Sequence, residues 1–210
     1  LSFPTPSLVL TGEKLGQLQG FLSLLAHWRK KVDLVAPAPF EQLIERHLVD
    51  SWAAWLLIEA LLQLPSDSAY LDIGSGAGLP GIIFALLQPE RQIFLCEPRE
   101  KRVLFMKEAR RELTIANVEI LQQRMEELDQ CDVPRTVLTM QRALGKESQF
   151  LFHSRRLLSG NGHAVQLCGP KKQTSIERRV VEELSIEKII KYSLGSKGPG
   201  RSLEVWKCFT

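Results

Sequence analysis

Along the first third of the chain, apolar residues recur at intervals of three and four, the spacing of one face of an α-helix. Residues 11–31 follow this period and predict an amphipathic helix. After two prolines the pattern resumes, and residues 40–62 predict a second helical stretch, bent near Asp50–Ser51, that ends before Pro65. We therefore expect residues 1–65 to form a small helical cap.

Beyond Pro65 the pattern changes to short apolar segments that alternate with amphipathic helices, as in βαβ units. The predicted strands cover residues 69–73, 92–96, 118–121, 137–140 and 163–167. One more helix is expected after Lys171–Lys172, and residues 186–194 and 203–209 then predict a β-hairpin. Residues 66–210 are thus expected to form a doubly wound α/β domain, with a mostly parallel seven-stranded sheet whose final strand is antiparallel.

The composition is that of a globular protein with one well-buried core. Of the 210 residues, 44% are apolar and 24% are charged, close to the averages for such proteins. The formal net charge of +3 comes from 27 basic and 24 acidic side chains. This mild excess permits nucleic-acid binding without requiring it.

Several classes of protein are disfavoured by the spacing of particular residue types. The four cysteines form no C-x-x-C pair and the four histidines show no ligand spacing, so we expect reduced thiols, no metal and a cytoplasmic location. The longest apolar run, residues 52–62, is too short to cross a membrane, and no signal peptide is recognised. We expect a monomer.

A glycine-rich turn follows the first predicted strand directly, as Gly74-Ser75-Gly76-Ala77-Gly78. Glycines let a ligand lie against the backbone, and the helix expected to begin near Leu79–Pro80 offers unpaired N–H groups. A dinucleotide fingerprint would need glycine where Leu79 stands. Asp72, before the turn, suits a sulfonium cation. The turn and the antiparallel final strand together favour the S-adenosylmethionine-dependent methyltransferase type of fold.

Glu97 follows the second predicted strand, where an acidic residue in nucleotide-binding sheets accepts the ribose hydroxyl protons. The alternative is that the glycines and Glu97 only form turns. Arg46–His47 and Asp50 precede an apolar stretch, and we place them over the mouth of the cofactor site. Alternatively, Asp50 is a helix N-cap and His47 a core histidine.

The remaining motifs limit the substrate. Residues 98–113 form a basic segment that contacts phosphates on one interpretation and is a solvated helix face on the other. Residues 139–144 lack the Asn/Asp-Pro-Pro-aromatic motif of amino-group methyltransferases, and no cysteine follows a proline as in cytosine-C5 enzymes. Neither chemistry is expected here.

Taken together, these motifs resemble the RsmG/GidB family over about residues 28–207. The matching segments are Arg46-His47-x-x-Asp50-Ser51, Asp72 to Ile82, Lys101-Arg102-x-x-Phe105, Arg124 to Glu127, and Arg142-Ala143. Leu79-Pro80-Gly81 after the glycine turn is the most specific of them. The sequence departs from the family pattern at Asp33-Leu34-Val35, at Glu97 and at Cys168, where a lysine is usual.

The resemblance implies methylation of N7 of one guanine in bacterial 16S rRNA, on the small ribosomal subunit. It implies that Gly74 and Leu79 line the cofactor pocket, that Met125 and Glu126 flank the adenine, and that Arg142 reaches the site. With Asp50 and His47, Arg142 is a candidate catalytic residue, assigned to cofactor or phosphate contact. The implied RNA-facing residues are Arg46, Lys101, Arg102, Lys171 and Lys207.

Two other functions are left open. One is a methyltransferase that acts on another RNA or on a small molecule. The other is a cofactor-binding, ribosome-associated protein that has lost turnover through changes such as Cys168.

Overall fold

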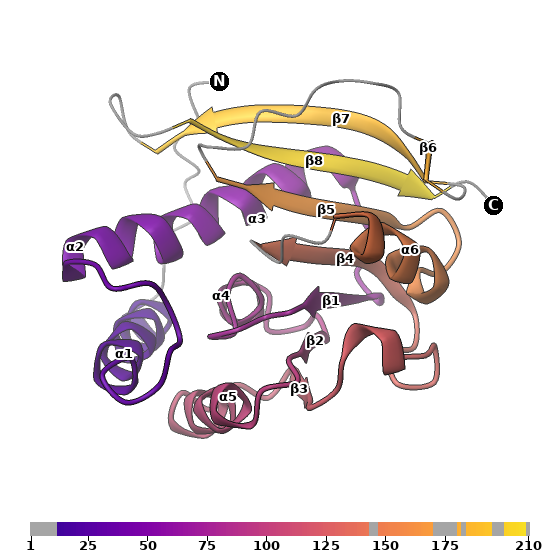
Figure 1. Ribbon diagram of the computed structural model, residues 1–210. Coiled ribbons are helices and arrows are strands. Elements are labelled where there is room, and N and C mark those ends of the chain that lie inside the picture. The colour runs from indigo at the N-terminus through magenta and orange to yellow at the C-terminus, as the bar shows by residue number, and fades with distance from the viewer. Residues whose placement is uncertain (1–11, 143–146, 170–179, 182–183, 195–199, 209–210) are drawn as a thin grey trace.

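The computed structural model describes residues 12–142, 147–169, 180–181, 184–194 and 200–208, which form helices packed on both faces of a central sheet (Figure 1). The strands are β1 (Ala69–Ile73), β2 (Ile93–Cys96), β3 (Val118–Leu121), β4 (Thr136–Arg142), β5 (His163–Cys168), β6 (Val180–Val181), β7 (Leu184–Ser193) and β8 (Gly200–Cys208). The α-helices are α1 (Gly12–Trp28), α2 (Phe40–Leu43), α3 (Asp50–Leu62), α4 (Gly81–Leu87), α5 (Glu100–Glu112) and α6 (Glu147–Leu157).

The strands lie in the order β3-β2-β1-β4-β5-β8-β7-β6. The first five are parallel, and β8 is antiparallel to both β5 and β7. The predicted doubly wound sheet with seven main strands and an antiparallel last strand is confirmed. The two-residue β6, antiparallel to β7, is an eighth strand that the sequence pattern did not predict.

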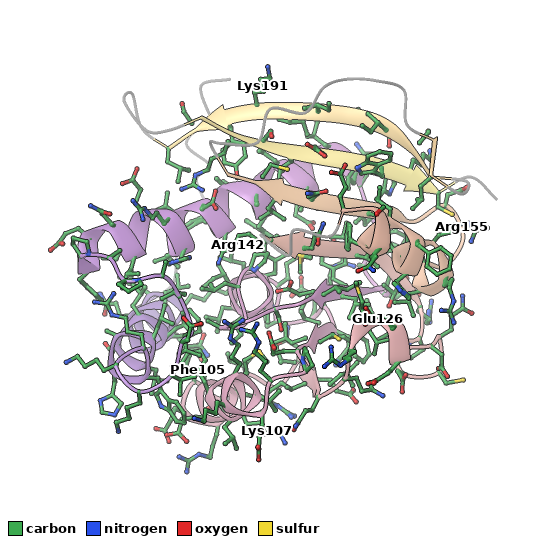
Figure 2. The ribbon with its side chains drawn as sticks, in the orientation of Figure 1. Phe105, Lys107, Glu126, Arg142, Arg155 and Lys191 are labelled. Atoms are coloured by element: carbon green, nitrogen blue, oxygen red, sulfur yellow. The ribbon has the colours of Figure 1, made fainter. Side chains whose placement is uncertain are left out.

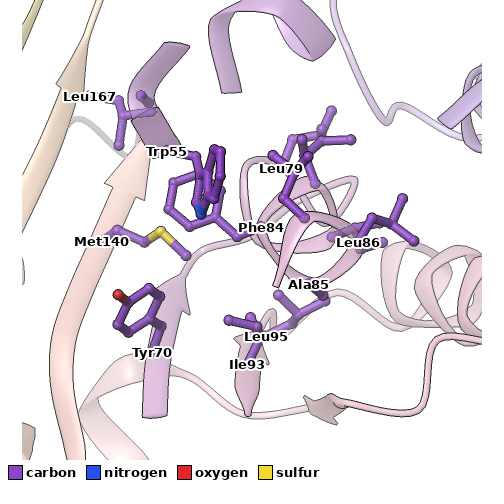
Figure 3. Close-up of a cluster of buried hydrophobic side chains, with 14 of the residues drawn as sticks. Trp55, Tyr70, Leu79, Phe84, Ala85, Leu86, Ile93, Leu95, Met140 and Leu167 are labelled. Atoms are coloured by element: carbon purple, nitrogen blue, oxygen red, sulfur yellow. The ribbon is translucent and has the colours of Figure 1, made fainter. Parts of the chain in front are cut away.

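One face of the sheet is covered by α1, α3, α4 and α5, which share a single hydrophobic cluster with the strands. Figure 3 shows Trp55, Phe84 and Met140 in this cluster, where α3, α4 and the sheet meet. Phe21 of α1 and Phe105 of α5 pack in a tilted arrangement with their ring centroids 6.0 Å apart. The N-terminal helices therefore pack into the main core of the sheet.

The opposite face is covered by α6 and by the short 3₁₀ helix η2 (Met125–Glu127). Phe150 and Leu151 of α6 and Met125 of η2 belong to a second cluster with Leu71 and Trp206. Every residue of β1 is buried, because its two sides face the two clusters. A strand that is buried on both sides holds the residues at its carboxyl end in fixed positions.

The predicted helix over residues 40–62 is continuous but changes type within it. A π-helical segment, η1 (Ile44–Val49), joins α2 to α3, and the Asp50 N–H donates to the carbonyl of Glu45, five residues back. This wider turn ends directly before Asp50–Ser51, where a bend was predicted, and the bend itself stays a prediction. The helix ends at Gln63, which adopts a left-handed conformation with φ 44°.

Three further predictions concern the position of Pro80, a later helix and the domain boundary. Pro80 is the N-cap of α4, one residue before the first-turn position predicted for it. The helix expected after Lys171–Lys172 lies outside the described residues, and the division at residue 65 stays a prediction. Within the described ranges, no helix has both the length and the apolar character needed to cross a membrane.

Candidate active site

A cavity of about 550 Å³ lies at the carboxyl ends of β1, β2 and β4. Its wall is built from the loop after α1, η1, the glycine turn, the residues after β2, and the end of β4. The lining residues are Leu34, Val35, Ala36, His47, Gly74, Ser75, Gly76, Ala77, Leu79, Glu97, Pro98, Arg99, Arg102 and Arg142. Ligands of open α/β sheets bind at this edge.

The glycine turn is held against β2 by its own backbone. The N–H groups of Gly74 and Ser75 both donate to the Cys96 carbonyl, at 2.9 and 3.0 Å. Gly78 has a φ of +74°, and a Cβ there would collide with Ile82. The turn therefore needs glycine for its shape, as its sequence predicted.

Asp72 lies beneath this turn and caps α4. Its Oδ2 accepts a hydrogen bond of 2.9 Å from the Gly81 N–H, and a Cβ on residue 81 would lie 2.9 Å from the same oxygen. Glycine at position 81 thus lets the carboxylate reach the helix. Burial raises the pKa of Asp72 to about 7, and its Oδ1 has no hydrogen-bond partner among the residues that the structure describes.

Glu97 is buried, and its carboxylate closes the β2 side of the cavity. It accepts hydrogen bonds of 3.0 Å from the backbone N–H groups of Gly76 and Arg99. Arg102 Nη1 lies 3.6 Å from Glu97 Oε2. A carboxylate has about four acceptor positions, so these contacts orient Glu97 and leave it able to accept hydroxyl protons from a ligand.

Arg102 also ties the loop after α1 to the cavity wall. Its Nε donates to the Asp33 carbonyl at 3.0 Å, and Nη2 lies 3.5 Å from the Asp33 carboxylate. The next three residues of that loop, 34–36, line the cavity. Arg102 therefore belongs to the wall, a position that its predicted RNA-facing role did not anticipate.

Arg142, at the end of β4, contacts η1 from across the sheet. One Nη atom lies 3.1 Å from His47 Nδ1, and the other donates to the Arg46 carbonyl at 3.4 Å. Burial and the nearby positive charges of Arg142, Arg201 and Arg46 lower the pKa of His47 to about 3. Because β1 separates β2 from β4, Arg142 and His47 lie across the glycine turn from Glu97.

Asp50 forms the centre of a buried charged cluster behind Arg142. Its Oδ1 accepts a hydrogen bond of 2.8 Å from the Tyr192 hydroxyl, and its Oδ2 accepts one of 3.2 Å from Arg201. Arg142 Nη1 lies 3.8 Å from Oδ2. Asp50 has helical backbone angles, φ −63° and ψ −46°, within a continuous helical run, so the alternative of a helix N-cap is wrong. The sequence pattern did not suggest Tyr192 or Arg201.

The predicted cofactor residues separate into three groups. Gly74, Ser75, Gly76, Leu79, Glu97 and Arg142 line the cavity. Asp72 and Gly78 support the turn from below. Met125 is buried in the second hydrophobic cluster, together with residues of α6, and Figure 2 shows Glu126 well apart from Arg142. Neither Met125 nor Glu126 lines the cavity, so their predicted place beside the adenine stays a prediction.

The residues predicted to face RNA are not brought together. Lys101 is exposed at the start of α5, and Arg46 lies near the cavity mouth beside His47. Lys207 of β8 lies beside His163 at the start of β5. This is the amino end of the parallel strands, whereas the cavity lies at their carboxyl ends. Lys171 lies outside the described residues.

The site fits S-adenosylmethionine in its donor set. Glu97 suits ribose hydroxyls, and the backbone of the glycine turn leaves room for a ligand. The Oδ1 of Asp72 has no hydrogen-bond partner in the described ranges of the chain, and a cationic ligand above the turn would favour the ionised form of this carboxyl. Among the described residues no cluster of three or more His, Cys, Asp or Glu side chains is placed to hold a metal ion.

Solved structures with a similar fold include S-adenosylmethionine-binding proteins. One is a mutant of MtNAS crystallised in complex with S-adenosylmethionine, with a TM-score of 0.62 over 93% of this chain and 76% of that one at 13% identity. Another is a SAM-dependent methyltransferase from Aquifex aeolicus, with a TM-score of 0.56 over 80% of this chain and 93% of that one at 12% identity. At these identities the likeness concerns the fold.

Proteins related in sequence identify the family, which the fold alone does not. The ribosomal RNA small subunit methyltransferase G of Halorhodospira halophila is 34% identical over 86% of this chain and 83% of its own length. The protein of the same name from Desulfotalea psychrophila is 33% identical over the same shares. Residues 14–203 match the family GidB, described as rRNA small subunit methyltransferase G. The chain therefore belongs to the GidB family of S-adenosylmethionine-dependent rRNA methyltransferases.

Proposed function

We propose that this protein transfers the methyl group of S-adenosylmethionine to N7 of a guanine in 16S rRNA of the small ribosomal subunit, in the cytoplasm. The observation that carries the proposal is the single cavity in which Glu97 lies on one side of the glycine turn and His47 with Arg142 on the other. A bound nucleoside cofactor would place its ribose at Glu97 and its methionine part toward β4.

The proposed reaction needs no general base. Guanine N7 carries a lone pair and no proton, so it attacks the methyl group directly. The cofactor supplies an activated methyl group on a cationic sulfur. The protein has then to hold the reacting atoms in line, which proximity and orientation accomplish.

Each part of the wall has a distinct task in this arrangement. The turn at residues 74–78 and Glu97 bind and orient the nucleoside, while Asp72 provides negative charge beneath a cationic ligand. Arg142 is restrained by Asp50 and His47. Residues 34–36 form part of the cavity wall. Lys101 and Arg46 are both exposed and are candidate phosphate contacts.

The proposal is tested by methyl transfer from labelled cofactor to small ribosomal subunits and to naked 16S rRNA, followed by mapping of the modified base. We expect label at N7 of one guanine. Label elsewhere would favour the methyltransferase of different substrate, and cofactor binding without transfer to any RNA would favour the protein without turnover.

Matched variants connect the activity to the cavity. Glu97→Ala removes the carboxylate that accepts from Gly76 and Arg99, and we expect cofactor affinity to fall by about tenfold or more, with transfer lost in proportion. Glu90→Ala changes an exposed carboxylate in the turn before β2 and should leave both unchanged. Equal behaviour of the two variants would contradict the assigned site.

A further inference from the structure

We propose that His47 recognises O6 of the target guanine through its Nε2–H and so selects guanine over adenine, an inference that rests on the proposed function. The neighbouring Arg142 determines which ring nitrogen of His47 carries the proton. This makes His47 a specificity-determining residue for the methyl-transfer reaction.

The proton position follows from the partner of Nδ1. Arg142 Nη2 lies 3.1 Å from that nitrogen, and a guanidinium has donors only. Nδ1 must therefore be the acceptor, and in a neutral imidazole the other nitrogen, Nε2, then carries the hydrogen. In the part of the chain that the structure describes, Nε2 has no hydrogen-bond partner.

The ring is also neutral. Burial, together with the positive charges of Arg142, Arg201 and Arg46, holds the pKa of His47 far below neutral pH. A neutral donor can lie beside the base without opposing the positive charge that guanine gains on N7 methylation, whereas an imidazolium would oppose it.

The position of His47 suits the base rather than the nucleoside of the cofactor. Glu97 is on the β2 side of the glycine turn, and His47 lines the same cavity on the β4 side, beside Arg142. Two of the donors of Arg142 are directed to His47 and the Arg46 carbonyl, and its charged group lies 3.8 Å from Asp50, which also accepts from Arg201. His47 is thus the wall residue with an available neutral donor at this end.

The edge of guanine that reacts has a second acceptor next to N7. Guanine presents N7 and O6, whereas adenine presents N7 and an amino group. N7 must keep its lone pair for the methyl group, so O6 is the remaining atom for recognition. An N–H donor at this place attracts guanine and repels the amino group of adenine.

The test removes the donor and the acceptor separately. Small subunits are reconstituted with 16S rRNA that carries guanine, hypoxanthine or 2-aminopurine at the target position. Hypoxanthine keeps O6 and lacks the 2-amino group, and 2-aminopurine keeps N7 and lacks O6. For the unaltered enzyme we expect single-turnover transfer to be similar for guanine and hypoxanthine and about 10- to 100-fold slower for 2-aminopurine.

His47→Phe keeps a planar ring without a donor. We expect its rate on guanine to fall by about the same 10- to 100-fold, while its preference for guanine over 2-aminopurine shrinks to about twofold. His47→Gln offers an amide donor and should recover part of the preference. Cofactor affinity and melting temperature should stay near those of the unaltered protein, as they should for His27→Phe, which changes an exposed histidine of α1.

A His47→Phe enzyme that still prefers guanine over 2-aminopurine would overturn the inference. So would a variant whose loss of rate is explained by weaker cofactor binding, because His47 would then belong to the cofactor site. If the unaltered enzyme transfers no methyl group to guanine N7, the proposed function itself fails, and this inference fails with it.

Discussion

Asp72 is a carboxylate whose ionisation is opposed by its surroundings. It is fully buried, and one of its oxygens accepts from the Gly81 N–H while the other has no partner in the described part of the chain. Burial raises its pKa from 3.8 to about 7, although the Gly81 N–H and Arg142 act in the opposite direction. Because the folded pKa exceeds the unfolded one, its contribution to stability is present below about pH 4 and is lost as the pH rises through 7.

This titration predicts a pH dependence of cofactor binding. A cationic ligand above Asp72 favours the ionised carboxylate, so binding releases a proton, and we expect the Kd for S-adenosylmethionine to fall by about tenfold between pH 6 and pH 8. His47 does not titrate in this range, since its pKa is about 3. Calorimetric titration at several pH values measures the effect.

Asp72→Asn is the matched variant. An amide oxygen can still accept from the Gly81 N–H, so α4 keeps its cap while the buried charge is removed. We expect its affinity to be lower at pH 8 and nearly independent of pH, and its melting temperature at pH 8 to be no lower than that of the unaltered protein. A pH slope that survives in this variant would assign the titration to another group.

At the scale of elements, the loop between α1 and α2 brings residues 34–36 from before the first strand into the cavity wall. Arg102 holds it by the Asp33 carbonyl, and Arg29 donates to the Ala38 carbonyl at 2.7 Å. The side chain of Asp33 is 85% exposed, and exposed ion pairs contribute only about 0–1 kcal/mol. The main-chain contact, not the ion pair, therefore fixes the loop.

This distinction predicts different effects for two substitutions in one ion pair. Asp33→Ala keeps the carbonyl that Arg102 contacts, so the Kd for the cofactor should rise by less than about fivefold. Arg102→Ala removes the bond to that carbonyl and the charge beside Glu97, and the Kd should rise by about tenfold or more. Titration of both variants with cofactor measures the two Kd values. Equal increases in Kd would show that the exposed ion pair contributes to cofactor binding.

What could be predicted from the sequence at this scale follows from the range of the interactions. The strands, the glycine turn and Glu97 are encoded by adjacent residues, and their predicted positions agree with the structure. Asp50 contacts Tyr192 and Arg201, which lie 142 and 151 positions farther along the chain. No local spacing indicates such pairs, and the two-residue β6 is too short to show a period.

The molecule as a whole has its N-terminal helices embedded in the core of the sheet. Phe21 and Leu25 of α1 and Ile58 of α3 are almost completely buried in one cluster with Tyr70 of β1. A helix that contributes this much apolar surface to the shared core cannot separate from it without a large loss of hydrophobic stabilisation. We therefore expect the whole protein to unfold as one unit.

Phe21→Ala tests this expectation. Truncation of a buried phenylalanine costs about 3–5 kcal/mol, which corresponds to a decrease in melting temperature of roughly 6–20 °C for a protein of this size. Calorimetry should show one transition before and after the substitution, shifted as a whole. Leu15→Ala, at a 45% exposed position of the same helix, is the control and should shift it little. A separate early transition for the N-terminal helices would indicate that residues 1–65 unfold independently.

The cluster around Asp50 also has a consequence for the synthesis of the protein. Asp50 is translated well before Tyr192 and Arg201, which hold its carboxylate. Until those two residues have been added, Asp50 lacks the partners that fix its position beside Arg142. A nascent chain thus acquires the complete β4 side of its cavity only after residue 201 has been added.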